Sequence, residues 1–372
     1  LRHISQALFF CHMRILFFLL ISLGALGQQT IQVTDLLKIK TAGKPSFAPD
    51  GKSYLYTVTS IEDDVEKKGD FVYQTHLYVA EVGTKTNRPL TAGKFSISSP
   101  SWSPDGRSIL FARDLGSKSQ AYLLSLAGGE PMALTSSSMG VQNPTWSKSG
   151  DAIFFQSSIS LKDFYLDSTW NKSKVRPSWT IEKPGISNDH YVPVAKPNPN
   201  GSLDEIRAYL AQNEKDKKAK VINRLQFQEE TATTGEFMLS ALFSQLLIPG
   251  SKPTLVNNPL HRWSDYEQLN ANELLVILPA DSLTHPDKVL ESQIVSFDLR
   301  TKTYKSILIK PGYRYSNLTL SSKGDQLAFF ESRSTGVSNP VLKVLNFSTG
   351  LIQTVNLDRV ITQLKWSADD SK

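Results

Sequence analysis

The chain has 372 residues, 40% of them hydrophobic and 20% charged, a composition that is typical of a folded globular protein and excludes a disordered or fibrous one. Its formal charge of +6 is too small to require nucleic acid or another anionic partner. The single cysteine, Cys11, excludes a disulfide framework and a zinc site built from several cysteines.

The first 27 residues have the pattern of a secretory signal. Met13-Arg14 precedes an apolar run from Ile15 to Leu23, and the small residues of Ala25-Leu26-Gly27 end it. We expect translation to start at Met13, so that residues 1–12 are upstream sequence. The apolar run is short for a membrane-spanning helix, which leaves a retained signal anchor as the alternative. We therefore expect an exported protein, periplasmic or extracellular, that does not span the membrane once the signal is removed.

The strongest pattern is a cassette that recurs along the chain. Between Trp102 and Phe111, an aromatic residue ends one strand, the tight turn Ser103-Pro104-Asp105-Gly106 follows, and apolar residues fill a second strand. Proline presets φ at the second turn position, and glycine takes the left-handed conformation that closes the turn. The copies are Phe47–Tyr56, Trp102–Phe111, Trp146–Phe155, a weaker Leu269–Ile277, Leu320–Phe329, and a sixth that begins at Trp366.

Each complete cassette is followed by a second hairpin, which gives four strands per repeat. The anchors of uninterrupted neighbours lie about 44 to 55 residues apart, the period of propeller blades. We therefore predict an all-β fold over residues 28–372: a β-propeller of about five complete four-stranded blades and a truncated one, incomplete at the C-terminus. The outer hairpins join His76–Ala80 to Arg88–Thr91, Ala121–Leu124 to Met132–Thr135, Phe243–Leu247 to Thr254–Val256, Gln293–Phe297 to Ser306–Leu308, and Leu342–Leu345 to Ile352–Val355.

Residues 160–236 break this rhythm and are predicted to form an insertion. The prolines of residues 161–201 argue against a regular helix or sheet there, and the aromatic residues among them indicate a packed loop. A capping box, Ser202 to Glu205, then starts a helix, and the lysines from Lys215 onward are expected to form its solvated end rather than a nucleic-acid site. Val221–Phe227 is predicted to return as a strand.

The sequence lacks the short motifs that mark common catalytic and nucleotide-binding sites. The chain has no H-E-x-x-H, no P-loop and no G-x-S-x-G; Gly185–Asp189 fails the last of these at its final position. The adjacent acids Glu229 and Glu230 are able to grip a substrate amine, but a solvated loop is the favoured interpretation. We assign no catalytic, cofactor-binding or metal-binding residue and expect no cofactor. The single histidines, expected to be structural or on the surface, are His76, His190, His261 and His285, and the glycosylation-type sites are Asn171, Asn317 and Asn346.

The Trp-Ser-Pro-Asp-Gly cassettes resemble the repeats of propellers in TolB-type periplasmic proteins and in serine peptidases of the prolyl-oligopeptidase family. Lys220–Phe227 is similar to a strand that the acylaminoacyl-peptidase/dipeptidyl-peptidase-like branch carries after an insertion in its propeller, and Gln32–Leu37 resembles the start of mature chains of that branch. Two places depart from the branch: Ala241-Leu242-Phe243 replaces a histidine-aromatic strand, and Thr233-Thr234-Gly235 replaces an Asp-Gly turn.

The resemblance implies the substrate-gating propeller of an exported serine oligopeptidase or exopeptidase. Because the cassette at Trp366 stops before its second strand, we expect further blades beyond Lys372. The resemblance places the α/β-hydrolase domain there too, with the catalytic serine, aspartate and histidine and the contacts to peptide substrates. The alternatives are a non-enzymatic TolB-type propeller that binds proteins in the periplasm, and a propeller fused to an amidohydrolase. The oligomeric state stays open.

Overall fold

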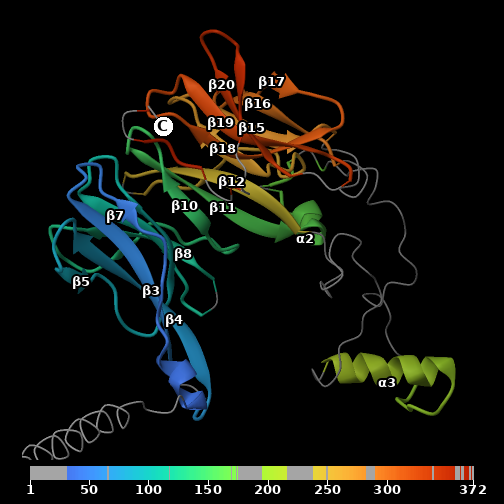
Figure 1. Ribbon diagram of the computed structural model, residues 1–372. Helices are drawn as coiled ribbons and strands as arrows, with labels where there is room; N and C mark the ends of the chain where they lie inside the picture. The colour runs from blue at the N-terminus through green and yellow to red at the C-terminus, as the bar shows by residue number, and fades with distance from the viewer. Residues whose placement is uncertain are drawn as a thin grey trace, which may run out of the picture. The chain divides into compact units, whose positions relative to one another are not determined.

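The computed structural model divides into two compact units, one made of Leu1–Ser46 and Lys52–Ser96, the other of Phe47–Gly51 and Ile97–Lys372 (Figure 1). The predicted signal, the predicted strand Val221–Phe227 and the sequence around Thr233 lie outside the described residues. The structure describes residues 32–64, 67–116, 118–168, 170–172, 174, 195–215, 238–248, 250–281, 290–336, 339–356, 361, 364–367 and 370.

The first unit is organised around one long antiparallel hairpin, β3 (Ser53–Asp63) and β4 (Phe71–Glu81), whose strands pair along their whole length. Its sheet follows the order β1-β3-β4-β5, and we call it blade 1. The remaining elements of this part of the chain are η1 (Val33–Lys38), β1 (Thr41–Ala42), β2 (Ser46–Phe47) and β5 (Asn87–Pro89).

The second unit contains four sheets, each with four antiparallel strands in chain order, which confirms the predicted fold of four-stranded blades. All five predicted outer hairpins, that of blade 1 included, are strand pairs in the structure. Blade 2 is β6 (Ile97–Trp102), β7 (Ser108–Arg113), β8 (Gln120–Ser125) and β9 (Met132–Ala133). Blade 3 is β10 (Gln142–Trp146), β11 (Ala152–Ser160), β12 (Met238–Leu246) and β13 (Thr254–Leu255). Blade 4 is β14 (Asp265–Gln268), β15 (Glu273–Pro279), β16 (Ser292–Asp298) and β17 (Tyr304–Ile309), and blade 5 is β18 (Tyr313–Leu320), β19 (Gln326–Arg333), β20 (Val341–Asn346) and β21 (Ile352–Val355).

A buried serine holds the cassette turn together. The Ser103 hydroxyl accepts hydrogen bonds from the backbone N–H groups of Arg107 (3.1 Å) and Ser108 (2.9 Å) and donates one to Asp105. Gly106 has φ 69°, the left-handed conformation expected from the sequence. Ser147 and Ser321 make equivalent bonds to the first residue of the second strand in blades 3 and 5. The turn is thus closed from within and needs no other element.

The core lies between neighbouring blades. Alternate residues of β15 enter different clusters: Leu274 and Val276 pack with Phe154 of blade 3, whereas Leu275 and Ile277 pack with Phe329 of blade 5. Both faces of the sheet are therefore buried, which explains why the second strand of each cassette is a continuous apolar run rather than an alternating one.

The insertion begins and ends within one hairpin of blade 3, because the last residue of β11, Ser160, pairs with the first of β12, Met238. Here the expectation of no regular structure is wrong at one point: Leu161–Leu166 is a helix, α2, which lies next to β11 (Figure 1). Ser160 caps it by accepting a hydrogen bond from the N–H of Asp163, and the first proline of the stretch comes only at 177. The predicted packing of aromatic residues holds for Trp170, whose ring meets Phe243 edge-on with centroids 5.0 Å apart.

The predicted helix is α3 (Leu203–Lys215), and its capping box is present. Glu205 accepts a hydrogen bond from the N–H of Ser202 (2.7 Å), and the Ser202 hydroxyl accepts one from the N–H of Glu205 (3.4 Å). Ala208 is buried, whereas Leu203, Tyr209 and Leu210 are exposed. Within the described residues, neither this helix nor any other is both long and apolar enough to cross a membrane.

Candidate functional site

The first strands of blades 2 to 5 lie side by side and form the inner edge of the second unit. Hydrogen bonds join Ser99 to Asn143, Thr145 to Tyr266, and Leu318 to Asp265, each pair bridging two successive blades. Blades of a propeller are arranged radially around a central channel, so strands that meet across several blades in this way are those nearest the channel. The inner edge is therefore the surface where we look for function.

Three of these strands carry a bulge with a residue in the left-handed conformation. Ser99, Asn143 and Asn317 have φ of 51°, 47° and 55°, and the pairing register of each strand shifts at that point. Such a φ is uncommon outside glycine, and a bulge redirects a side chain relative to a regular ladder. The Ser99 hydroxyl donates to Asn143 Oδ1 (3.1 Å), and Asn143 Nδ2 donates to Gln156 Oε1 (3.3 Å). The bulges thus connect polar side chains of neighbouring blades.

Blade 4 places an acid, Asp265, at the equivalent position. One oxygen of its carboxylate accepts the N–H of Leu318 in the bulge of blade 5 (2.8 Å), and the other accepts the N–H of Tyr266 (2.9 Å). Burial raises the pKa of Asp265, and these two donors act in the opposite direction. The carboxylate therefore ties blade 4 to the strained segment of blade 5.

A second acid, Glu267, lies on the same face of β14 as Asp265, because alternate residues of a strand share a face. Burial raises the pKa of Glu267 to about 7, the negative charge of Asp265 adds to the shift, and Lys148 opposes it. Lys148 is held close by: its backbone N–H donates to Gln268 Oε1 (2.6 Å) and its Nζ to the carbonyl of Leu269 (3.2 Å). At neutral pH the inner edge thus contains a carboxyl group close to its titration midpoint.

Tyr266, between the two acids in β14, is a neutral hydrogen-bonding group. Burial raises its pKa to about 12, and its hydroxyl lies 3.2 Å from the Thr145 hydroxyl of blade 3. Sequence reasoning named only Asn317 among these inner-edge residues, as a glycosylation-type site, and assigned none of them to an inner edge. The signal that finds them is alignment of the cassettes three residues before each anchor, with Gln268 as the anchor of blade 4, because Ser99, Asn143, Asp265 and Asn317 coincide there.

Among the described residues, no hydrogen bond joins His76 or His261 to a serine or threonine hydroxyl. His76 lies in β4, and His261 Nδ1 lies 3.2 Å from the hydroxyl of Tyr304. Because the indole of Trp263 donates to the same oxygen (3.2 Å), the Tyr304 O–H is left to donate to a neutral His261. Burial lowers the pKa of His261, in keeping with that neutral form. His190, His285, Glu229 and Glu230 lie outside the described residues.

Two asparagines of the glycosylation-type sites are engaged in the fold. Asn346 Oδ1 accepts hydrogen bonds from the backbone N–H groups of Ser348 (3.0 Å) and Thr349 (2.9 Å), and Asn171 is buried. Asn317 is the bulge residue of β18.

Among the described ranges, no three His, Cys, Asp or Glu side chains gather in a way that fits a metal ion. That no residue of this chain is catalytic stays a prediction.

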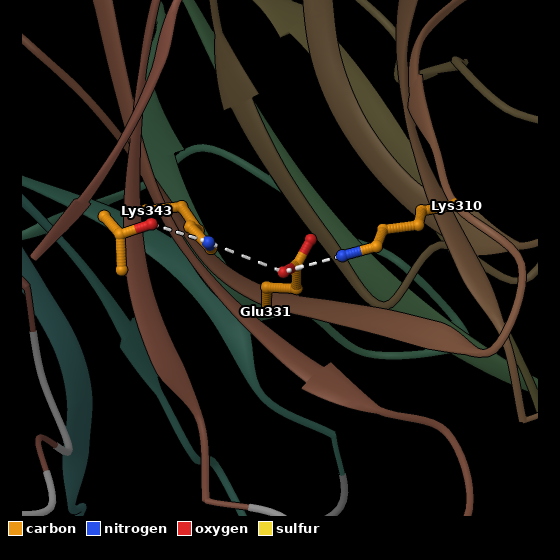
Figure 2. A network of polar contacts seen from close by, with 4 residues as sticks. Lys310, Glu331 and Lys343 are labelled. Carbon is orange, nitrogen blue, oxygen red and sulfur yellow. Dashed lines mark hydrogen bonds and ion pairs between the residues drawn. The ribbon is translucent and has the colours of Figure 1, made fainter. Parts of the chain in front are cut away.

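A polar network in blade 5 balances a buried acid (Figure 2). Glu331 is 9% exposed, and its Oε1 lies 3.4 Å from Nζ of Lys310 and 3.7 Å from Nζ of Lys343. Lys343 also donates to the hydroxyl of Thr354 (2.7 Å). Since the two lysines, from β20 and the loop after β17, both neutralise one carboxylate of β19, the network serves the packing of this blade.

Comparisons with known proteins agree with a propeller fold. Residues 20–168 match the PD40 family model, described as a TolB beta propeller domain. Over 108 residues the chain is 31% identical to the uncharacterized peptidase YuxL of Bacillus subtilis (strain 168), a match that spans 29% of this chain and 16% of that protein.

Two solved structures share the fold at low sequence identity. The acylaminoacyl peptidase of Pyrococcus horikoshii is 11% identical, with 88% of this chain and 41% of that chain covered and a TM-score of 0.52. The oligogalacturonate lyase of Vibrio parahaemolyticus is 12% identical, with 88% and 68% covered and a TM-score of 0.50. The chain thus spans less than half of the peptidase chains it matches. Residues 20–168 are thus similar to the TolB beta propeller model, and the described part of the chain shares a fold of four-stranded blades with these solved structures.

Proposed function

We propose that residues 28–372 belong to the substrate-gating propeller of an exported serine oligopeptidase or exopeptidase of the acylaminoacyl-peptidase-like branch. The observation that carries the proposal is the 31% identity to a peptidase over 108 residues. Because the match covers 16% of that protein, the proposal places the α/β-hydrolase domain beyond Lys372. Export would follow from the signal at residues 13–27, with the mature protein periplasmic or extracellular.

The contacts of the sixth cassette support further blades in the same ring. Trp366 donates its indole N–H to the carbonyl of Thr319 (2.9 Å), as Trp146 does to the carbonyl of Ser101 (3.4 Å). The carboxylate of Asp370 accepts the N–H groups of Ser322 (2.7 Å) and Lys323 (2.9 Å). The sixth cassette therefore contacts blade 5 as an established blade contacts its predecessor.

In this proposal the propeller selects peptides by size and the hydrolase domain cleaves them. A closed ring of blades leaves a narrow axial channel, which admits extended or short peptides and excludes folded proteins by size. The inner edge, with its serine, asparagine and acidic side chains, offers hydrogen bonds to a passing peptide backbone. The proposed hydrolase domain would supply a serine nucleophile, a histidine base and an oxyanion hole for acyl transfer.

The test uses the full-length gene product. A fluorophosphonate probe is expected to label one serine outside residues 28–372, and replacement of that serine by alanine is the matched control. The protein is expected to hydrolyse short peptides, and the rate of hydrolysis is expected to fall steeply as the peptide becomes longer. Folded full-length protein that neither reacts with the probe nor cleaves peptides contradicts the proposal.

A second candidate is a non-enzymatic TolB-type propeller that binds proteins, favoured by the family model that matches residues 20–168. The two are separated by the reading frame downstream of residue 372. A nucleophile elbow supports the peptidase, an early stop supports the binding propeller, and a histidine-rich metal barrel supports fusion to an amidohydrolase.

A further inference from the structure

A pocket lies between blades 2 and 3, beside the cassette turn of each blade. Its volume is about 300 Å³, which is at the lower end of the range for pockets that hold a small ligand. Pro104 of one turn and Gly150 of the other both line it, and a Cβ on Gly150 would lie 3.5 Å from the Pro104 ring. The pocket is therefore built by the contact between two blades, within the second compact unit.

Three large side chains give the pocket an apolar wall: Leu123 of blade 2, and Trp146 and Leu247 of blade 3. Leu123 pairs with Leu110 across β7 and β8, and Trp146 and Leu247 pack on the buried cluster that contains Leu110. The pocket is thus an outward extension of the core between the two blades. Such a wall stabilises the apolar stem of a ligand, and a tryptophan ring attracts a cation that lies over its face.

The polar part of the lining carries one charge, the carboxylate of Asp105. Its Oδ1 accepts hydrogen bonds from the Ser103 hydroxyl and from the N–H of Arg107 (3.0 Å). These bonds lower the pKa of Asp105, so the exposed carboxylate is negative at neutral pH. Within the described residues, Oδ2 accepts no hydrogen bond from a side chain, and Arg107 forms no ion pair with the acid. One carboxylate oxygen is therefore available to a ligand.

Two further hydroxyls, those of Ser108 and Ser149, line the same pocket. The N–H of Ser108 donates to Ser103 (2.9 Å), and no hydrogen bond among the described residues uses the Ser108 hydroxyl. The Ser149 hydroxyl donates to Asp151 and keeps its lone pairs as acceptors. A cation with several N–H donors thus meets one carboxylate and two hydroxyl oxygens here, whereas an anion would be repelled by Asp105.

We propose that this pocket binds one arginine side chain of a polypeptide that docks on the turns of blades 2 and 3, with the guanidinium on Asp105 and the alkyl stem along Trp146 and Leu123. A guanidinium carries five N–H donors in a plane, matches a carboxylate and stacks on aromatic rings, which a lysine ammonium does less well. The volume suits a single side chain and excludes a folded element. The site goes beyond the proposed peptidase function and does not depend on a hydrolase domain.

The test is fluorine NMR of the full-length protein labelled with 5-fluorotryptophan. The signal that disappears in Trp146→Phe is assigned to Trp146, which lines the pocket. The probe is an arginine blocked at both ends, Nα-acetyl-L-arginine N-methylamide, and its neutral counterpart is the corresponding citrulline derivative. We expect the arginine derivative to shift the Trp146 signal until it saturates, and the citrulline derivative to cause no shift over the same concentrations.

Two variants test the residues of the site. Asp105→Asn keeps an acceptor for the turn but removes the charge, and it is expected to weaken binding about fivefold or more. Its matched control is Asp298→Asn, because Asp298 also accepts N–H groups of a turn, those of Arg300 (2.8 Å) and Thr301 (2.7 Å), but does not line the pocket. Ser108→Leu fills the pocket and is expected to abolish binding in protein that circular dichroism shows to be folded.

Three outcomes overturn the proposal: equal shifts from the arginine and citrulline derivatives, a Trp146 signal that does not move, or an unchanged affinity in Asp105→Asn. Free L-arginine that binds far more tightly than the blocked derivative would identify the amino acid as the ligand and contradict a docking polypeptide. The result is independent of the peptidase test. A protein whose serine reacts with a fluorophosphonate but whose pocket binds no arginine derivative keeps the peptidase and loses the site, and the converse result does the opposite.

Discussion

The indole N–H of Trp366 donates a hydrogen bond to the carbonyl oxygen of Thr319, 2.9 Å away, in the inner strand of the preceding blade. Trp146 makes the same contact with Ser101. In blade 4, Gln268 occupies the anchor position, and its side chain accepts the N–H of Lys148 instead. The anchor of a cassette is thus a link to the blade before it, which gives a physical reason for tryptophan at the position.

Replacing Trp146 by phenylalanine keeps most of the apolar contact and removes the bond to Ser101. We expect the free energy of unfolding to fall by about 1 kcal/mol, measured by urea denaturation. Tyr209→Phe in α3, where the side chain is 37% exposed, is the control and is expected to be neutral. An unchanged midpoint for Trp146→Phe would mean that the indole bond adds no stability.

Ser321 and its neighbour Ser322 offer a matched pair. The Ser321 hydroxyl is buried, accepts the N–H of Gln326 (3.0 Å) and donates to Asp325 (2.9 Å), whereas Ser322 is exposed and donates to Asp370 on the surface. Ser321→Ala is expected to cost about 1 to 3 kcal/mol, because it leaves a buried N–H without its acceptor. Ser322→Ala is expected to stay within about 0.5 kcal/mol in the same denaturation experiment. Equal costs would refute the role of the hydroxyl.

Because the pKa of Glu267 is raised, we expect the free energy of unfolding to fall as the pH rises. Its pKa is about 7 in the folded protein and near the usual 4.5 when unfolded, so between these values the folded state binds more protons. Stability from this group is present at low pH and is lost on going from about pH 4.5 through pH 7. Glu267→Gln is expected to flatten that slope and to be more stable than the parent at pH 8, by about 1 to 3 kcal/mol. The measurement is urea denaturation across pH 5 to 8, with Glu81→Gln, at the exposed end of β4, as the control. A slope that survives Glu267→Gln must come from other groups.

Glu331→Gln removes the charge that two lysines share. The variant leaves Lys310 and Lys343 near each other without their carboxylate, and we expect a loss of about 1 to 2 kcal/mol. The Lys310 side chain is 47% exposed, so Lys310→Gln is expected to cost less than about 1 kcal/mol. Comparable losses for the two variants, measured by thermal unfolding at one salt concentration, would contradict a network centred on the acid.

The sequence predicts the parts of this fold that are encoded locally. The Ser103–Gly106 turn closes with its own side chains, and the outer hairpins follow from strand propensity and short loops, so a local pattern is enough to predict both. Helix α2 was missed because the prolines of the wider stretch dominated the pattern, although Ser160 offered an N-cap. The inner edge was missed for a different reason. The pKa of Glu267 depends on burial and on Lys148, which is distant along the chain, and no local pattern reports that meeting.

The pairing of Ser160 with Met238 makes the connection between β11 and β12 a place where insertions of different length are tolerated. The intervening segment leaves and rejoins the blade at adjacent points, so its length beyond α2 and Trp170, which pack on the blade, is free to change without altering the register of β11 and β12. A short connector grafted between these two residues should leave the hairpin intact, and an unrelated module inserted there would be displayed by the same scaffold.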